Sequence, residues 1–356
     1  MMIPIELIFN PNWWYLNDDI CFDESFYMHL QKRIDNDFEM RSYLFNRFGI
    51  GNKPIKREPV IGSTLVAGGF VMPALFGVPI EFFDNEAPWP TGQPMSDSEI
   101  LALEPPNIKE TWPISSLLKD ATQLIEMYGY VIGDFDLDGF FNTALHLRGQ
   151  QLFVDLIEKP ALVNHLFSVL VQTYISLVKL MRKLTKTCAI STNRSIINVN
   201  PEIFLHSNCS VSMISPKVYK EHVLPHEMKL ATELQPYGIH HCGDNMHRFS
   251  DIYNQVPSHF FDVGWGSDVK KCSQIFTRAF LNLRLSPVRL LQCGSEEIYQ
   301  DTFSVLQSTN RFVNVGICCI NMDAGTPDEN VRAIYNAVED YEINVHRRNL
   351  DENSAS

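Results

Sequence analysis

From about residue 115, short apolar runs alternate with longer segments whose apolar residues have helical spacing. Buried strands that alternate with helices predict a parallel sheet, because a parallel connection needs a crossover that is usually helical. With at least six such runs in 356 residues, we predict a closed (β/α)8 barrel, the TIM barrel, in preference to an open doubly wound sheet. The predicted strands are YVIGDFD, SIINVN, GIHHCG, HFFDVGW, AFLNLRL and RFVNVGICCI.

Three of the segments between these runs carry clear helix signals. Residues 114–129, ISSLLKDATQLIEMYG, place apolar residues close to helical spacing. Residues 161–186 form a longer apolar segment that closes on Lys and Arg, as the helix dipole favours. A third helix is expected behind Ser215-Pro216, since proline suits the first turn of a helix.

The first hundred residues have a different composition, rich in Pro, Gly and aromatic residues. We predict that residues 1–110 form an N-terminal extension, with short helices and one or two strands, packed on the barrel. Residues 111–348 are expected to form the main part of the barrel, and 349–356 a loose tail. The whole chain is expected to be one structural domain.

Charge and motifs exclude several classes of function. Lys and Arg number 29 against 42 Asp and Glu, a net charge of −13, so neither nucleic acid nor an anionic membrane is an expected partner. No signal peptide, membrane span, GxGxxG or GxxxxGK[ST] motif is found. The eight cysteines are scattered through a long chain, which favours a reducing, cytoplasmic location with free thiols.

The end of one predicted strand reads His240-His241-Cys242-Gly243. Residues two apart on a strand point to the same side, so His240 and Cys242 can bind one ion while His241 faces away. A second thiol pair, Cys318-Cys319, ends a later strand, and only one of the two should point into the barrel mouth. One imidazole and two thiolates suit zinc and leave its fourth position open. The alternative is that these cysteines are small buried hydrophobes.

Three segments together resemble the uroporphyrinogen decarboxylase superfamily over roughly residues 115–340. They contain a Ser-Pro-x-x-Tyr helix start, an HxCG strand end and a TPxEN helix start. Their sequences are HSNCSVSMISPKVYKEHVLPHEMKLATEL, GIHHCGDNMHRF and VGICCINMDAGTPDENVRAIY. The resemblance implies the same barrel fold.

Within that superfamily, the chain resembles the zinc-dependent, cobamide-linked methyltransferases, whose HxC…C motif binds zinc. The resemblance implies His240, Cys242 and Cys319 as the metal ligands, with Cys318 as the alternative third ligand. It also implies Zn2+ as cofactor and a corrinoid supplied by a partner protein. The methyl group would move between that corrinoid and a small substrate: a thiol, a folate or a methoxy-aromatic compound.

Two other functions remain open at this point. One is a metal-free decarboxylase of a tetrapyrrole polycarboxylate, which the absence of an RQAGR-like arginine segment disfavours. The other is a non-catalytic barrel that binds a corrinoid or another partner and uses its thiols structurally. A metal with an open position would separate the methyltransferase from both.

Further site residues are predicted at strand ends, where barrel enzymes place their chemistry. Asp134 ends a strand, and Asp244 follows the HxCG strand, where it could orient a ligand. Loop hydrogen bonding and capping are the alternatives for these residues. Arg148 and Arg284 could contact an anionic substrate, but internal ion pairing is the preferred interpretation. The predicted catalytic residues are Asp134, Asn208 and Asp244, and the predicted substrate-binding residues are His206, Asp262 and Trp265.

Overall fold

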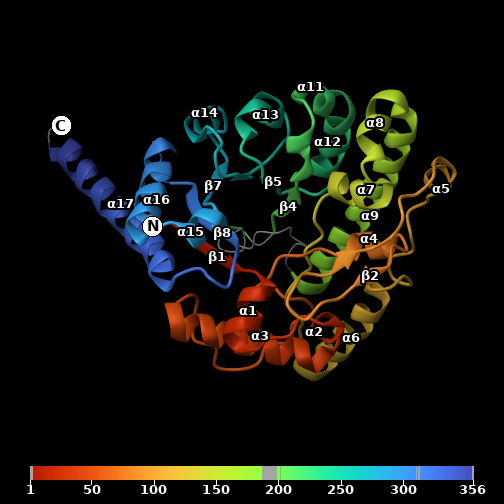
Figure 1. The fold of residues 1–356 in the computed structure, drawn as a ribbon, viewed down its shortest axis with the longest axis horizontal. Helices are drawn as coiled ribbons and strands as arrows, with labels where there is room; N and C mark the ends of the chain where they lie inside the picture. Colours follow the sequence, from red (N-terminus) through yellow and green to blue (C-terminus); the bar gives the residue numbers. More distant parts are fainter. Residues whose placement is uncertain (1–2, 187–198, 201, 310, 312, 355–356) are drawn as a thin grey trace.

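A computed structural model describes residues 3–354, with gaps at 187–198, 201, 310 and 312 and without the side chains of 347–354. Most of the predicted strand SIINVN and Cys188 therefore lie outside the described residues. Helices surround a central sheet, and helix α17 (Asp328–Ser354) runs away from it toward the C-terminus (Figure 1). This helix includes most of the segment 349–356 that we expected to be loose.

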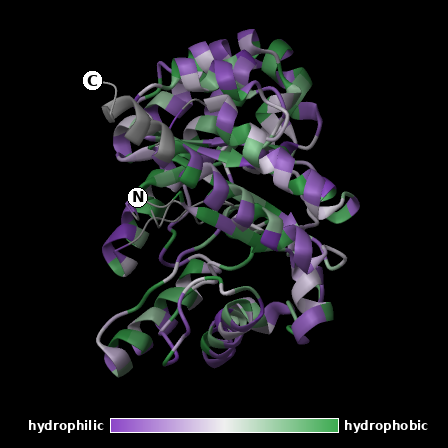
Figure 2. Cartoon of the chain, turned by 90° about the vertical axis from the view of Figure 1, so that its left-hand side faces the viewer, coloured by the Kyte–Doolittle hydropathy of each residue, from purple (hydrophilic) through white to green (hydrophobic). Residues whose placement is uncertain are grey.

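The main sheet has six strands, in the order β1-β8-β7-β6-β5-β4, and every neighbouring pair is parallel. It forms half of a barrel, with apolar strands at the centre of the molecule (Figure 2). The strands predicted at GIHHCG, HFFDVGW, AFLNLRL and RFVNVGICCI are confirmed as β5 to β8, whereas β4 was not predicted. The strand bounds are β1 Ile5–Phe9, β4 Phe204–Ser207, β5 Tyr237–His241, β6 Phe260–Val263, β7 Phe280–Arg284 and β8 Val315–Met322.

Closure into an eight-stranded barrel is not confirmed. Within the described residues the sheet ends at β4 on one side and at β1 on the other. The run YVIGDFD makes only an isolated parallel bridge, between Ile132 and Val60. The backbone leaves the extended conformation immediately after this bridge, because Gly133 has a φ of 90°.

The crossover helices cover the outside of the sheet. The helix predicted at Ser215-Pro216 is confirmed: Ser215 is its N-cap, and its side chain accepts a hydrogen bond from Val218 N. The last helix begins within the TPxEN motif, at Asp328, and Asn330 Nδ2 donates to Leu290 O and Cys293 O, each over 2.8 Å. The crossover bounds are η1 Ser210–Met213, α11 Pro216–Val218, η2 Tyr219–Val223, α12 Leu224–Glu233, α13 Met246–Tyr253, α14 Val269–Ile275, α15 Pro287–Gln292 and α16 Ser295–Thr309.

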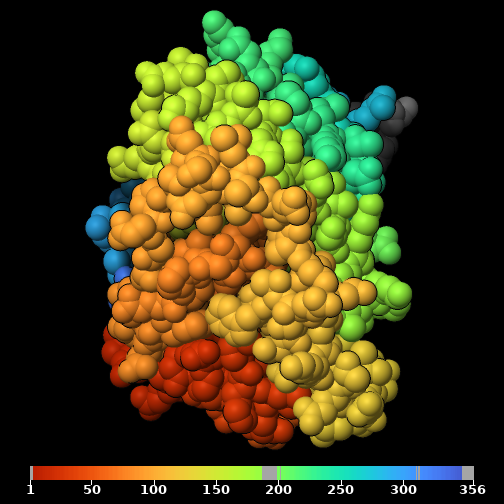
Figure 3. All heavy atoms as spheres, turned by 90° about the vertical axis from the view of Figure 1, so that its right-hand side faces the viewer, coloured from red at the N-terminus to blue at the C-terminus, as the bar shows by residue number. Residues whose placement is uncertain are grey.

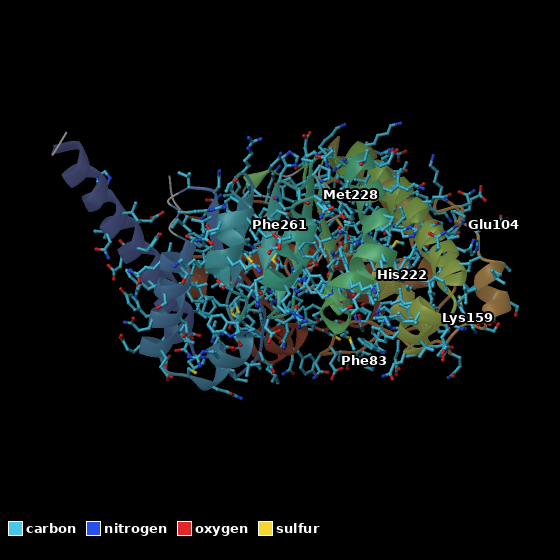
Figure 4. The ribbon with its side chains drawn as sticks, turned by 90° about the horizontal axis from the view of Figure 1, so that it is seen from above. Phe83, Glu104, Lys159, His222, Met228 and Phe261 are labelled. Carbon is cyan, nitrogen blue, oxygen red and sulfur yellow. The ribbon has the colours of Figure 1, made fainter. Side chains whose placement is uncertain are left out.

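The helices predicted at 114–129 and 161–186 are confirmed as α6 (Ile114–Tyr128) and α9 (Pro160–Thr185). Helix α9 is long and apolar enough to cross a membrane, but 61% of its most apolar window is buried, as in the core helix of a folded domain. Seen from above, α12, which carries Met228, lies beside α9, which begins after Lys159 (Figure 4). Helices α7 (Phe140–Arg148) and α8 (Gln151–Glu158) precede α9.

The N-terminal residues contribute directly to the sheet, because β1 pairs with β8 along its whole length. This strand therefore belongs to the half-barrel rather than to an extension laid over it. Residues of about 50–130 form most of one face of the molecule (Figure 3). The elements of this part are α1 Pro11–Asp18, α2 Glu24–Met28, α3 Leu30–Phe48, α4 Val71–Leu75, β2 Ile80–Glu81, β3 Trp89–Pro90 and α5 Asp97–Leu101.

Aromatic residues of the N-terminal part pack into the core. Trp13 and Trp14 have no exposed surface, and their rings meet edge to face at 5.0 Å. Phe9 at the end of β1 lies 4.0 Å from the Trp13 ring, and Phe48 stacks on Phe9 at 5.5 Å. This cluster anchors α1 and α3 to the edge of the sheet by burying large apolar surfaces.

Candidate functional site

A cavity of about 980 Å³ opens at the carboxyl ends of the strands. Its floor contains the strand-end residues His240, Cys242 and Arg284 together with Cys209, which follows β4. The walls come from the N-terminal part, from the segment before α7 and from helices α7 and α8, and they include Gly68, Trp89, Asp136, Asp138, Asn142 and Phe153. The parallel sheet thus places its polar strand ends where the barrel prediction expected them.

Strand register brings three polar residues into one row. His240 on β5 is paired with Asp262 on β6, and Asp262 with Asn282 on β7. His240 Nδ1 donates a hydrogen bond to Asp262 Oδ2, and Asn282 Nδ2 donates to Asp262 Oδ1 over 3.0 Å. All three side chains are fully buried. Because Nδ1 is bound to Asp262, Nε2 is the ring nitrogen available toward the cavity.

Arg284 brings a positive charge to the same floor. Its Nη1 lies 3.2 Å from His240 Nε2 and 3.0 Å from Cys242 Sγ. Burial lowers the pKa of His240, as does the Arg284 cation, but the Asp262 carboxylate raises it, and the net value is about 9. Sequence reasoning expected Arg284 in an internal ion pair; the structure places it among cavity-lining residues.

Cys242 is exposed to the cavity and forms a hydrogen-bonded pair with Cys209. The hydrogen bond from Cys209 lowers the pKa of Cys242 far below its usual value, with further contributions from His240 and Arg284. The same bond, together with burial, raises the pKa of Cys209. Cys242 is therefore the thiolate of the pair and Cys209 the thiol, so the floor holds a soft anionic donor.

The donor atoms of Cys209, His240 and Cys242 all lie within 4.8 Å of one another. Among the residues that the structure describes, these three form a group that could hold a metal ion. His241 faces away as predicted: its Nδ1 bonds Tyr253 Oη at 2.9 Å and its Nε2 bonds Asn245 at 2.8 Å.

The β8 cysteines point elsewhere. Cys318 Sγ donates to Asp262 Oδ1 over 3.3 Å, and Cys319 Sγ donates to Leu285 O over 3.6 Å. Both side chains are fully buried, and burial raises the pKa of Cys319 to about 12. The structure therefore does not bring Cys319, or its alternative Cys318, to the donor atoms of His240 and Cys242.

His206 and Asn208 belong to a buried network around Glu227. His206 Nδ1 donates to Glu227 Oε1 over 3.1 Å, and its Nε2 accepts from Phe140 N over 3.1 Å. Asn208 Nδ2 donates to Glu227 Oε2 over 3.1 Å. Neither residue lines the cavity, and Tyr219, the tyrosine of the Ser-Pro-x-x-Tyr motif, also donates to Glu227. The network connects β4 to α12 and to the start of α7.

The other predicted site residues also lie away from the cavity. Asp134 is buried at a separate cavity of about 40 Å³, and Asp244 is exposed at the surface. Trp265 is half-buried, and its ring lies 6.0 Å from the guanidinium of Arg289. Asp262 contacts His240 rather than the cavity.

Sequence reasoning did not assign the cavity residues Cys209, Asp138 and Asn142. Asn142 Nδ2 donates to Asp138 Oδ1 over 2.5 Å, and burial and the neighbouring Asp136 raise the pKa of Asp138 to about 6. Asp138 was visible in the GDFDLDG run. Cys209 follows β4, a strand that the sequence pattern did not predict, so its place beside the HxCG strand is visible only in the structure. Arg148, in contrast, forms the internal ion pairs expected, with Asp97 and Asp155.

The uroporphyrinogen decarboxylase (URO-D) family model matches residues 53–341. The chain therefore belongs to this family, as the sequence motifs predicted. Among solved structures, it is similar to a methyltransferase from Methanosarcina mazei, with a TM-score of 0.68 and 16% sequence identity. That match covers 96% of this chain and 94% of the other, so the two share their fold over nearly the full length.

A B12-independent methionine synthase from Shewanella sp. W3-18-1, solved in complex with selenomethionine, matches with a TM-score of 0.40 and 9% identity. The match covers 66% of this chain and 67% of that one, and a TM-score of this size carries no argument about the present chain. The sequence matches no curated protein.

Proposed function

We propose that this chain is a zinc-dependent methyltransferase that moves a methyl group between a small substrate and a corrinoid carried by a partner protein. The observation that carries the proposal is the pair formed by His240 and Cys242 on the floor of the large cavity. The fold shared with a methyltransferase is consistent with this function. A cytoplasmic location fits a chain that depends on free thiols.

The residues of the floor fit a zinc ion. Imidazole nitrogen and thiolate sulfur are the donors that zinc prefers, and His240 presents Nε2 while a carboxylate holds Nδ1, as metal-binding histidines commonly do. The Arg284 guanidinium lies against both donors, so metal binding requires this side chain to turn into the cavity. Zinc bound there would supply Lewis acidity to the heteroatom from which, or to which, the methyl group moves.

The side chains around the floor position this chemistry. Asp262 fixes the ring of His240, and Asn282 fixes Asp262, so Nε2 keeps one direction. Arg284, once turned, places a cation in the cavity for an anionic group of the substrate. Trp89 and Phe153 provide apolar walls, and a volume of about 980 Å³ is ample for a thiol, a folate pterin or a methoxy-aromatic ring.

The charges of the cavity argue against the decarboxylase function. Its described lining carries four carboxylates against one arginine, and it includes no lysine. A polycarboxylate substrate would meet repulsion from these groups, because like charges that lose water repel strongly. The acidic residues of the lining are Glu86, Asp136, Asp138 and Asp323.

The proposal is tested by measuring methyl transfer in both directions with the purified chain. Methylcobalamin is mixed with a panel of thiols and a folate, and cob(I)alamin with methoxy-aromatic donors, while corrinoid absorbance reports the transfer. We expect transfer that requires zinc and is lost in His240→Ala and Cys242→Ser, but not in His241→Gln. Uroporphyrinogen decarboxylation without methyl transfer, or a chain that binds no zinc, would overturn the proposal.

A further inference from the structure

We infer that Cys209, from the loop after β4, is the third protein ligand of the metal, in the place that the family resemblance assigns to a cysteine of β8. The inference rests on the proposed function, since it concerns the same metal. The motif that the sequence shows, HxC followed by a distant Cys, would then describe only two of the three ligands.

Strand pairing places Cys209 beside the HxC strand end. Ser207 is paired with His240 in the parallel register of β4 and β5, and Asn208 N donates to His240 O over 2.7 Å. The chain after β4 therefore continues alongside the end of β5. Cys209 reaches the level of Cys242 there, and the donor atoms of both cysteines and of His240 fall within 4.8 Å.

The loop that carries Cys209 is anchored on both sides. Ser212 Oγ donates to Cys209 O over 3.0 Å, and Ser210 N donates to Asn142 Oδ1 over 3.0 Å. The thiol itself lies 3.1 Å from Ser207 Oγ and lines the cavity. A ligand fixed by its backbone loses little conformational freedom on binding a metal, which favours a preformed site.

The β8 cysteines do not lie beside Nε2, the nitrogen of His240 that would bind the metal. Cys318 contacts Asp262, the residue that holds Nδ1, whereas the metal must bind Nε2 on the opposite edge of the ring. Cys319 points to the other face of β8, toward Leu285 O. Neither Cys318 nor Cys319 lines the cavity, so ligation through either requires β8 to be rebuilt.

The ligand set is two thiolates and one imidazole. On binding, bonds would form from the metal to Cys209 Sγ, Cys242 Sγ and His240 Nε2, and the thiol proton of Cys209 and the Nε2 proton of the His240 imidazolium would leave to solvent. Three protein ligands would leave a fourth position on a zinc ion for a substrate atom.

The test compares Cys209→Ser, Cys318→Ser and Cys319→Ser with the unaltered chain. Zinc affinity is measured for each protein by competition with a chelator. Each protein is also loaded with Co2+, because the thiolate-to-cobalt charge-transfer absorbance reports the number of bound thiolates. We expect Cys209→Ser to weaken zinc binding by at least about tenfold and to halve the charge-transfer absorbance, whereas the β8 variants keep both. Circular dichroism monitors folding of every variant.

A Cys209→His variant separates loss of a ligand from loss of structure. We expect it to restore metal affinity relative to Cys209→Ser while keeping the absorbance of one thiolate. Loss of affinity in Cys319→Ser or Cys318→Ser, with Cys209→Ser unchanged, would overturn the inference and leave the proposed function standing. No effect of any of the three serine substitutions would also overturn it. An unaltered chain that binds neither metal would refute the proposed function itself.

Discussion

The guanidinium of Arg284 donates a hydrogen bond to the sulfur of Cys242 over 3.0 Å, and the same Nη1 lies 3.2 Å from His240 Nε2. A cation from the end of β7 is therefore held against one donor on β5, His240, and one directly after it, Cys242. This contact adds to the larger effect of Cys209 in lowering the pKa of Cys242, and it also competes with a metal ion for both donors. The predictions below follow from this arrangement and from the buried networks behind it.

Replacing Arg284 by Met should tighten zinc binding. The substitution removes a cation that competes with zinc for the two donors and repels a divalent ion. Cys242 does not need Arg284 to bind the metal as a thiolate, because zinc itself deprotonates a coordinating thiol. We expect zinc affinity to rise at least about threefold in chelator competition at neutral pH. Arg289→Met, which removes a surface arginine paired with Asp301, is the control and should leave the affinity unchanged. Weaker binding in Arg284→Met would show that thiolate stabilisation outweighs competition.

Replacing Asp262 by Asn should weaken zinc binding without unfolding the chain. The amide keeps the shape of the carboxylate and can still accept from His240 Nδ1, but it no longer increases the basicity of the ring. We expect a loss in affinity of about 10- to 100-fold, the usual cost of removing such a partner. Metal titration together with thermal unfolding distinguishes this from a loss of fold, and unchanged affinity would rule out the orienting role of Asp262.

Replacing Glu227 by Ala should destabilise the protein strongly. This carboxylate has no exposed surface and accepts hydrogen bonds from His206, Asn208, Tyr219 and Tyr237. Removing it leaves these donors buried without their acceptor, at a cost of about 3–5 kcal/mol. Urea unfolding measures the loss, and Glu227→Gln should cost less because the amide oxygen still accepts. A loss below ~1 kcal/mol for Glu227→Ala would contradict the importance of the network.

Stability should fall in mild acid because of His226. Burial, with a smaller contribution from Lys229, lowers the pKa of His226 from 6.5 to about 4. The unfolded chain therefore binds a proton between these two pH values while the folded chain does not, so the free energy of unfolding decreases as the pH falls from 6.5 toward 4. The difference corresponds to at most ~3 kcal/mol.

The measurement is urea unfolding as a function of pH in the unaltered chain and in His226→Gln. The glutamine can keep the contact with Asn164 on α9 that joins α12 to that helix, and it carries no titrating group. We expect a shallower pH dependence in this variant. An identical slope would show that other groups control the acid stability.

Local pattern was sufficient for much of the fold. The strands GIHHCG, HFFDVGW, AFLNLRL and RFVNVGICCI and the helices α6 and α9 lie where their periodicity placed them. Periodicity reports which residues of a segment are buried, and that property depends on a few neighbours along the chain. Closure of the sheet depends instead on how YVIGDFD pairs with distant segments, and the turn at Gly133 limits it to one bridge.

The candidate site shows the same division between what the local sequence pattern determines and what the tertiary structure determines. By itself, the sequence determined that His240 and Cys242 lie two residues apart at the end of one strand and that the chain belongs to the URO-D family, because both properties depend only on the order of residues. Only the tertiary structure decided that Asp262 holds the histidine, that Cys318 and Cys319 turn away, and that Cys209 and Arg284 reach the same floor. Those relationships depend on the register between parallel strands, which sets side chains from separate segments at one level of the sheet.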